Sequence, residues 1–215
     1  MSRCLALGFL LLFAALPGCT FAGSIRDAEI AECRSGEIAT WQDGRDRPVT
    51  GAVLLFAYRH DGAPPWFERA EVEKRLAQAV RGWAPCGVPV ATATDGSGAI
   101  VVQWTEAGSR GNFGLANLGQ RTLSLGPSAF GLLHSHNPGH DALQTLQMVI
   151  SHEMGHFFGL IAHSRRCVDV LSYYDAAGAK CFTRNPAGMP PGVEYRSILP
   201  TACDIARCRA VNRLD

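Results

Sequence analysis

The chain has 215 residues, of which 47% are hydrophobic and 18% are charged, and its formal net charge is +1 at pH 7. This length suits one domain with a sizeable core, and the composition is that of a globular protein and not of a disordered one. The 20 lysines and arginines nearly balance the 19 aspartates and glutamates and form no basic block, which argues against nucleic acid as a partner.

The first 18 residues have the features of an export signal. Arg3 precedes an apolar run over residues 5–16, which is too short to span a bilayer. The tetrapeptide LPGC that ends at Cys19 resembles a bacterial lipobox, in which Cys19 would be lipidated and become the mature N-terminus. The alternative is a plain signal peptide that is cut after Ala22. Both alternatives predict export. The first predicts a lipoprotein of the cell envelope that only its lipid attaches to the membrane, and the second predicts a secreted protein.

Residues 19–41 are polar and irregular, and we predict that they are a tether leading into one domain over residues 42–215. The domain is predicted to start with a strand, because residues 53–58 (VLLFAY) are an apolar run before the turn cluster HDGAPP. Residues 66–83 have apolar positions at helical spacing with charges on the opposite face, which predicts a helix.

Two further strands are predicted at residues 99–104 (AIVVQW) and 121–125 (RTLSL), and a weaker one at residues 88–92. The glycine-rich stretch over residues 106–120 is interpreted as a surface loop.

A long helix is predicted to start at Asp141, a favourable N-cap, and to end at Gly159, while a last helix is predicted to start near Thr201. This order of elements predicts an α/β fold of the α+β type, with about three helices packed on a small twisted mixed sheet.

The most informative motif lies on the long helix, in residues 151–164 (SHEMGHFFGLIAHS). His152 and His156 are four residues apart, so they project from one face of a helix and can hold one Zn²⁺. Glu153 stands beside the first histidine, where it can take a proton from a metal-bound water. The His-Glu-x-x-His pattern is only moderately specific by itself, and the alternative is two ordinary histidines on a plain helix.

The stretch HEMGHFFGLIAHS resembles the signature of the metzincin zinc peptidases, most closely that of their matrixin-like and astacin-like branches. In these families the helix ends at the glycine, and a third histidine three residues later completes the metal site. Ala162 holds that place here, and His163 comes one residue later. Beyond Gly159 the chain is not expected to be helical, so a bulge can absorb the extra residue, and we predict His163 as the third ligand. Asp169 is the reserve, because carboxylates also bind zinc.

The resemblance continues in the segment after the third histidine. Metzincins place a turn with a methionine beneath the zinc, often followed two residues on by a tyrosine. Leu171 stands here in place of the methionine and keeps its volume and apolarity. Tyr173 matches the astacin-like tyrosine that can contact the zinc or a developing oxyanion, and its alternative is an ordinary core tyrosine. The resemblance implies catalytic roles for Glu153 and Tyr173, and a metzincin-like catalytic domain in which the zinc helix precedes an irregular C-terminal subdomain.

Six cysteines follow Cys19: Cys33, Cys86, Cys167, Cys181, Cys203 and Cys208. An even number favours disulfides in an exported protein, and we predict that Cys167 and Cys181, which flank the Leu171 turn, bridge. Cys203 and Cys208 point to different sides of a regular helix, so each is predicted to pair with Cys33 or Cys86. The segment around Cys86 resembles the inhibitory cysteine segment of matrixins, but it follows the first strand and helix, and a disulfide is the better interpretation.

These features predict an exported, monomeric zinc endopeptidase with one catalytic Zn²⁺ that acts on proteins or peptides. The sequence does not decide whether the protein also binds a structural Ca²⁺ or a second Zn²⁺. His134, His136 and His140 could hold a second metal, but they are interpreted as part of a polar loop. The alternative is a binding protein that kept the fold and lost activity, since the third histidine is late and the turn methionine is missing. The retained Glu153 argues against it. A gluzincin-type site is rejected, because Glu194 lies in a Pro/Gly-rich stretch and not on a second helix.

Overall fold

The computed structural model describes residues 24–51, 53–176, 178–189 and 191–214. The predicted export signal and Cys19 lie outside the described residues. Within the described ranges, no helix combines the length and apolarity that crossing a membrane would need.

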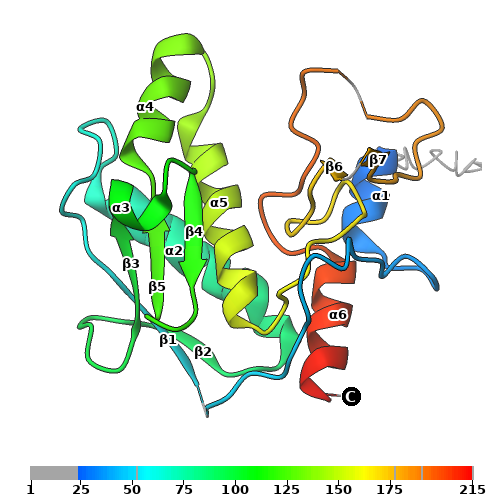
Figure 1. Cartoon of the computed structure of the whole chain (residues 1–215), viewed down its shortest axis with the longest axis horizontal. Coiled ribbons are helices and arrows are strands. Elements are labelled where there is room, and N and C mark those ends of the chain that lie inside the picture. The colour runs from blue at the N-terminus through cyan, green and yellow to red at the C-terminus, as the bar shows by residue number, and fades with distance from the viewer. Residues whose placement is uncertain (1–23, 52, 177, 190, 215) are drawn as a thin grey trace, which may run out of the picture.

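Five strands form one mixed sheet in the order β2-β1-β3-β5-β4 (Figure 1). The parallel strands are β1 (Leu54–Tyr58), β2 (Val90–Ala93), β3 (Ile100–Trp104) and β5 (Thr122–Leu125). The edge strand β4 (Gly114–Asn117) runs antiparallel to β5. In β3, Ile100, Val102 and Trp104 are buried while the residues between them are half-buried, which is the period of a strand with one face in the core.

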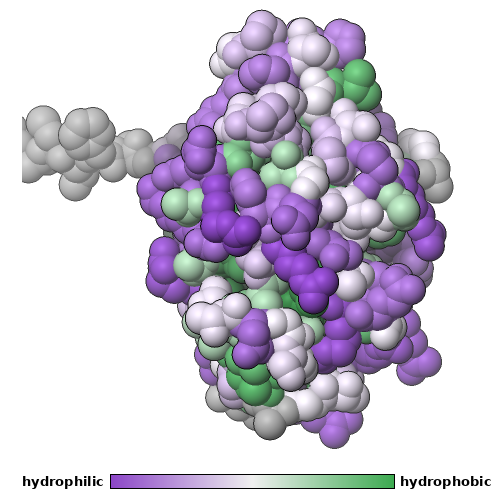
Figure 2. Space-filling view, turned by 90° about the vertical axis from the view of Figure 1, so that its left-hand side faces the viewer, coloured by the Kyte–Doolittle hydropathy of each residue, from purple (hydrophilic) through white to green (hydrophobic). Residues whose placement is uncertain are grey.

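Two long helices pack on this sheet and against each other. Helix α2 (Arg69–Trp83) contacts β2, and helix α5 (Ala142–Phe157) contacts β4 and β5. The indole N–H of Trp83 donates to the carbonyl of Ser151 (2.9 Å), which ties the two helices together. The molecular face on the sheet side is mainly hydrophilic, with small separate apolar patches (Figure 2). The mixed sheet with helices packed on it confirms the predicted α+β class.

The described residues contain six α-helices, more than the three that were predicted. Helix α6 (Ala202–Asn212) begins where it was predicted to begin, and Thr201 is its N-cap. Three short helices were missed: α1 (Ile25–Ala31), α3 (Glu106–Ser109) and α4 (Pro127–His136). The remaining elements are a 3-10 turn η1 (Ala84–Cys86) and a hairpin of β6 (Asp175–Ala176) and β7 (Ala179–Lys180).

Residues 24–41 differ from the predicted tether, because they fold onto the C-terminal part of the chain. The side chain of Glu29, on α1, is fully buried and accepts hydrogen bonds from the hydroxyls of Tyr195 (2.7 Å) and Thr183 (2.9 Å). A disulfide joins Cys33 to Cys203 on α6. The polar residues of this segment thus have distant partners, which local composition cannot reveal.

All three disulfides agree with the predicted pairing. Cys33 bridges to Cys203, Cys86 to Cys208, and Cys167 to Cys181. The first bridge attaches the segment after α1 to α6, the second attaches η1 at the end of α2 to α6, and the third closes the loop that contains Leu171. The segments around the end of α5 are therefore covalently braced.

Candidate metal centre

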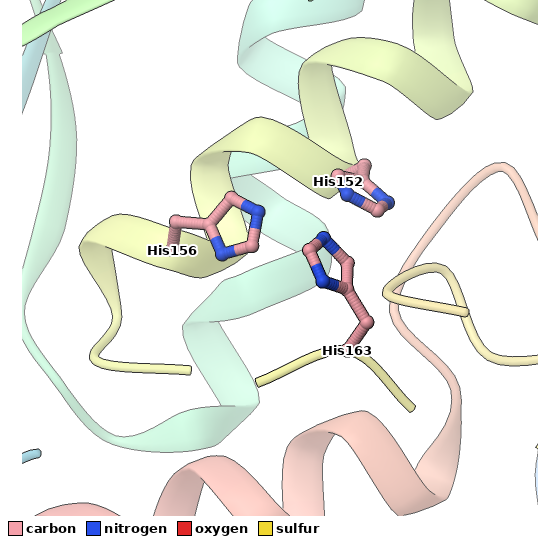
Figure 3. A group of neighbouring side chains, drawn as sticks. All are labelled: His152, His156 and His163. Carbon is pink, nitrogen blue, oxygen red and sulfur yellow. The ribbon is translucent and has the colours of Figure 1, made fainter. Parts of the chain in front are cut away.

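Three histidines converge on one point (Figure 3). His152 and His156 project from the same face of α5, and His163 faces them from the segment after the helix. One ligand nitrogen from each lies within 4.8 Å of those of the other two. Nitrogens that share a tetrahedral Zn²⁺ at 2.0–2.1 Å would be about 3.4 Å apart, so small side-chain rotations suffice to close the set. The three predicted ligands are thus brought together.

The chain leaves the helix at Gly159 in a way that only glycine permits. Helix α5 ends at Phe157, and Gly159 has a left-handed φ of +89°. A Cβ on Gly159 would collide with the carbonyl oxygen of Arg47, whose own amide donates to the Gly159 carbonyl (3.1 Å). Because the following segment is not helical, the extra residue does not rotate His163 away from the helix.

Two aspartates hold this non-helical segment. Asp46 Oδ1 accepts hydrogen bonds from the amides of Ile161 (2.8 Å) and Ala162 (3.0 Å). Asp43 Oδ1 accepts from the amide of His163 (2.9 Å), and its Oδ2 lies 2.6 Å from His163 Nδ1. Two carboxylates therefore satisfy three consecutive amides and orient the ring that follows the bulge. Neither aspartate was singled out from the sequence, since both lie more than a hundred residues before the loop they hold.

Each imidazole has an acceptor at Nδ1. His152 Nδ1 lies 2.8 Å from the carbonyl of Val170, and His156 Nδ1 lies 2.7 Å from the carbonyl of Leu160. Together with the carboxylate at His163, these contacts place the proton on Nδ1 and leave Nε2 free as a ligand. Among the described residues, His163 Nε2 is a buried nitrogen without a hydrogen-bond partner. A metal ion would satisfy this atom.

Burial keeps the three imidazoles neutral. Desolvation, with the neighbouring histidines adding to it, lowers the pKa of His152 well below its ordinary value. Desolvation also lowers the pKa of His156 to about 4, and that of His163 is lowered for the same reason against the opposing effect of Asp43. Neutral imidazole is the form that binds a divalent metal, so the donor set fits Zn²⁺.

Glu153 faces the edge strand. Its Oε2 accepts a hydrogen bond from the amide of Ala116 on β4 (2.8 Å). Desolvation raises the pKa of Glu153 to about 7, against the lowering effect of this bond. Strand and helix approach closely because residue 114 is glycine: a Cβ there would lie 2.5 Å from Val149 Cγ1 and 2.8 Å from Glu153 Cγ. The stretch interpreted as a surface loop thus contributes a strand to the site, which corrects that prediction.

The turn over residues 170–173 forms the floor and one wall. Leu171 is fully buried, and a Cβ on Gly155, between the helix histidines, would lie 3.0 Å from Leu171 Cδ1. An apolar side chain therefore lies under the metal-binding face of α5. The Tyr173 ring stacks on His163, with centroids 3.7 Å apart and planes at 14°. Tyr173 is 44% exposed, so it borders the cleft and is not a core tyrosine.

Asp169, the reserve ligand, lies outside the histidine group. Its carboxylate accepts hydrogen bonds from the hydroxyls of Ser164 (2.6 Å) and Thr201 (2.6 Å) and from Nη1 of Arg166 (3.0 Å). These contacts occupy Asp169 in a buried polar network that connects the loop after His163 to the start of α6.

The other candidate metal groups have other partners. His134 stacks on Trp66 with ring centroids 4.4 Å apart, and His140 Nε2 lies 2.6 Å from the hydroxyl of Thr145. His134 and His136 belong to the last turn of α4 and not to the polar loop that was predicted. Cys33, Glu37 and Cys203 lie close together, but the two cysteines form a disulfide and offer no thiolate.

The histidines and Glu153 lie in a cleft of about 440 Å³. This cleft is also lined by residues 112–116 and Leu118 and by Tyr173 and Arg196. Along β4, backbone groups that pair with β5 alternate with groups that point away from it. The Ala116 amide belongs to the second set, so the unpaired edge of β4 faces the cleft.

Comparisons with known proteins identify no family. No family model matches the chain, and no curated protein matches it. Seventeen solved chains match, among them one described as the GM1 bound form of the ECX AB5 holotoxin, which is 14% identical over 75% of this chain and 80% of that chain with a TM-score of 0.46. At this similarity the match identifies neither the fold nor the activity of this chain.

Proposed function

We propose that the protein is an exported, monomeric zinc endopeptidase of the metzincin type that hydrolyses peptide bonds in proteins. The observation that carries this proposal is the convergence of three neutral imidazoles, one with an unpartnered buried Nε2, beside a carboxyl with a pKa of about 7. Three histidines leave one position of a tetrahedral zinc open, which is the arrangement of catalytic sites and not of structural ones.

Bound Zn²⁺ would supply a Lewis acid for the scissile carbonyl and would lower the pKa of the attacking water. Glu153 is the residue that takes the proton from this water and returns it to the leaving amine nitrogen. Burial raises the pKa of Glu153 to about 7 in the metal-free protein, and a bound Zn²⁺ would lower it again, towards the ionised form that accepts this proton. The hydroxyl of Tyr173, at the rim of the cleft, would donate a hydrogen bond to the developing oxyanion.

The open edge of β4 supports a peptide as the substrate. Apart from the Ala116 amide, which donates to Glu153, its outward backbone groups can pair with an extended peptide, which would add a strand to the sheet. Such a peptide would lie directly above the histidines, because the Ala116 amide already reaches Glu153. A scissile bond is thus delivered in one orientation by main-chain contacts, which any sequence can make.

The same proposal includes export through the N-terminal signal. Three disulfides are typical of proteins that fold in an oxidising compartment. If Cys19 carries lipid, the protein should partition with membranes, and Cys19→Ser should release it. An unmodified mature N-terminus at Gly23, found by mass spectrometry, would instead indicate simple secretion.

The decisive experiment combines metal analysis with hydrolysis of a denatured protein. We expect about one zinc per chain and loss of activity in chelator. Glu153→Gln should keep the zinc and lose activity by about 10²- to 10⁴-fold, whereas Glu73→Gln, on the exposed face of α2, should change neither. Full activity of Glu153→Gln would refute the mechanism. A zinc-loaded protein that hydrolyses nothing would favour the binding-protein alternative.

A further inference from the structure

The cleft continues past the histidines. A second hollow of about 310 Å³ adjoins it, and Leu118, His156 and Ile161 line both. We call this hollow the arginine groove and define it by six of its lining residues: Arg47, Val49, Leu118, Arg121, His156 and Phe157. A peptide that lies along β4 over the histidines would extend from Leu118 into this groove.

The arginine groove has an apolar wall and two cations. Among the described residues, no aspartate or glutamate lines it, and neither Arg47 nor Arg121 takes part in an ion pair. Arg121 uses one nitrogen, Nη2, to donate to the carbonyl of Gly98 (2.9 Å). The remaining guanidinium donors are available to a ligand.

Each arginine lies in a segment that is held to an element of the metal centre. The Arg47 amide donates to the Gly159 carbonyl, at the turn that ends α5. Arg121 follows the turn between β4 and β5, where the Gln120 amide donates to Asn117 Oδ1 (3.0 Å). The two cations are therefore carried by the two segments between which a peptide would pass.

We propose that the arginine groove binds an acidic side chain of the substrate, on the side of the scissile bond that lies over His156. This inference rests on the proposed function, because its cleavage test requires peptidase activity. A guanidinium fork matches a carboxylate, and Val49 and Phe157 offer apolar surface to the methylene groups of Asp or Glu. Because alternate side chains of an extended peptide face one side, the preference should fall on one position or on two alternate positions.

Cleavage of a proteome-derived peptide library by the zinc-loaded protein, with sites mapped by mass spectrometry, tests this preference. We expect Asp and Glu to be favoured over Asn and Gln by about 3- to 10-fold in kcat/KM at low salt, and less at high salt. The double variant Arg47→Gln, Arg121→Asn should lose the preference and still cleave neutral peptides. Asn is chosen because Arg121 has a φ of +53°, which Asn tolerates well.

The control is Arg81→Gln, which removes an equal charge from the exposed side of α2, away from both hollows, and should keep the preference. Absence of an acidic preference in the unaltered protein, or its persistence in the double variant, would overturn the inference.

A binding measurement separates this inference from the proposed function. Zinc-loaded Glu153→Gln is titrated with a fluorescent peptide that contains Glu at the mapped position and with its Gln counterpart; if nothing is cleaved, a set of peptides with Glu at successive positions replaces the mapped one. Tighter binding of the Glu peptide that disappears in the double variant supports the groove even if no hydrolysis occurs. Equal binding of the Glu and Gln peptides contradicts the groove even if hydrolysis is fast.

Discussion

At the residue scale, His163 reaches the metal centre because other residues hold the loop before it. Arg207 on α6 donates to both oxygens of Asp46 (2.7 and 2.8 Å), and Asp46 in turn holds two amides of the bulge. Arg207 also donates to the carbonyl of Ala162. His163 therefore follows a loop whose backbone is held by defined hydrogen bonds.

The identity of the third ligand is testable by zinc titration against a chromophoric chelator. His163→Ala should weaken zinc binding as much as His152→Ala or His156→Ala, because an open catalytic zinc has three protein ligands. Asp169→Asn, which keeps the volume of a residue in a separate network, should leave zinc affinity unchanged. Deleting Ala162 should be harmful, since its amide and carbonyl are both bonded. Undiminished affinity in His163→Ala would mean that another group is the third ligand.

Asp43 should act on zinc through His163. Asp43→Asn weakens the acceptor at Nδ1 and is expected to reduce zinc affinity by about 10- to 100-fold. Asp46 contacts backbone amides of the bulge and Arg207 but not a histidine ring, so Asp46→Asn should reduce zinc affinity less. Thermal unfolding of the metal-free variants controls for general damage. Equal loss in both variants would show that the aspartates only support the loop.

Glu153 should make the metal-free protein sensitive to pH. Its folded pKa of about 7 lies above the unfolded value of about 4.3, so the folded state binds this proton more tightly. The stability that this group contributes is therefore present at low pH and is lost as pH rises from about 4 to about 7. The glutamine side chain of Glu153→Gln can still accept the hydrogen bond from the Ala116 amide. We therefore expect the free energy of unfolding of this variant to equal that of the wild type at pH 4 and to exceed it at pH 8 by on the order of 3 kcal/mol. Urea unfolding at both pH values measures the difference, and a pH-independent difference would contradict it.

At the element scale, β4 decides the shape of the site. Its sequence, GLAN, has little strand propensity, and the strand forms because it pairs with β5 and covers α5. A pattern of apolar alternation could not reveal it. The neighbouring strands β1, β3 and β5 contain β-branched or aromatic residues in register with a core, and these were predicted.

Gly114 tests the dependence of the site on the position of β4. Gly114→Ala puts a Cβ against Val149 and Glu153, so β4 or the catalytic carboxyl must move. We expect turnover to fall by at least about 10-fold with zinc content unchanged, since displacement by a fraction of an ångström disturbs catalytic geometry. Gly119→Ala is the matched control, because its nearest neighbour is 3.7 Å away. Equal activity of the two variants would exclude a role for the close approach.

At the scale of the whole molecule, the first and last parts of the described chain form one structural unit. Cys33–Cys203 closes 170 residues, whereas Cys167–Cys181 closes 14. Buried Arg166 bonds to Asp169 and to the carbonyl of Glu29, which joins α1 to the loop after His163. Loss of the long bridge should therefore loosen the loop that holds the third histidine.

The two bridges should differ in their effect on stability. Because Cys86–Cys208 stays closed, the loop that Cys33–Cys203 adds runs through that bridge and spans about 60 residues. In the chain-entropy description such a loop stabilises by about 4 kcal/mol and one of about 14 residues by about 3 kcal/mol. We expect Cys33→Ser with Cys203→Ser to lower the free energy of unfolding more than Cys167→Ser with Cys181→Ser. Urea unfolding of the metal-free variants measures both, and a larger loss in the second pair would contradict the expectation.

The sequence by itself determined the elements whose pattern is local. Helix geometry predicted the apolar periods of α2 and α5 and the single face shared by His152 and His156. The N-cap Asp141 and the start of α6 near Thr201 were also predicted from local sequence. The divergence of Cys203 and Cys208 on one helix excluded a bond between them and left two pairings with Cys33 and Cys86, between which the structure decided. Tertiary structure alone decided what covers this helix: the edge strand β4, the docking of α1, and the aspartates that hold the bulge before His163. These contacts join different elements of the chain and depend on the packing of the whole fold, so they leave no local periodic signal in the sequence.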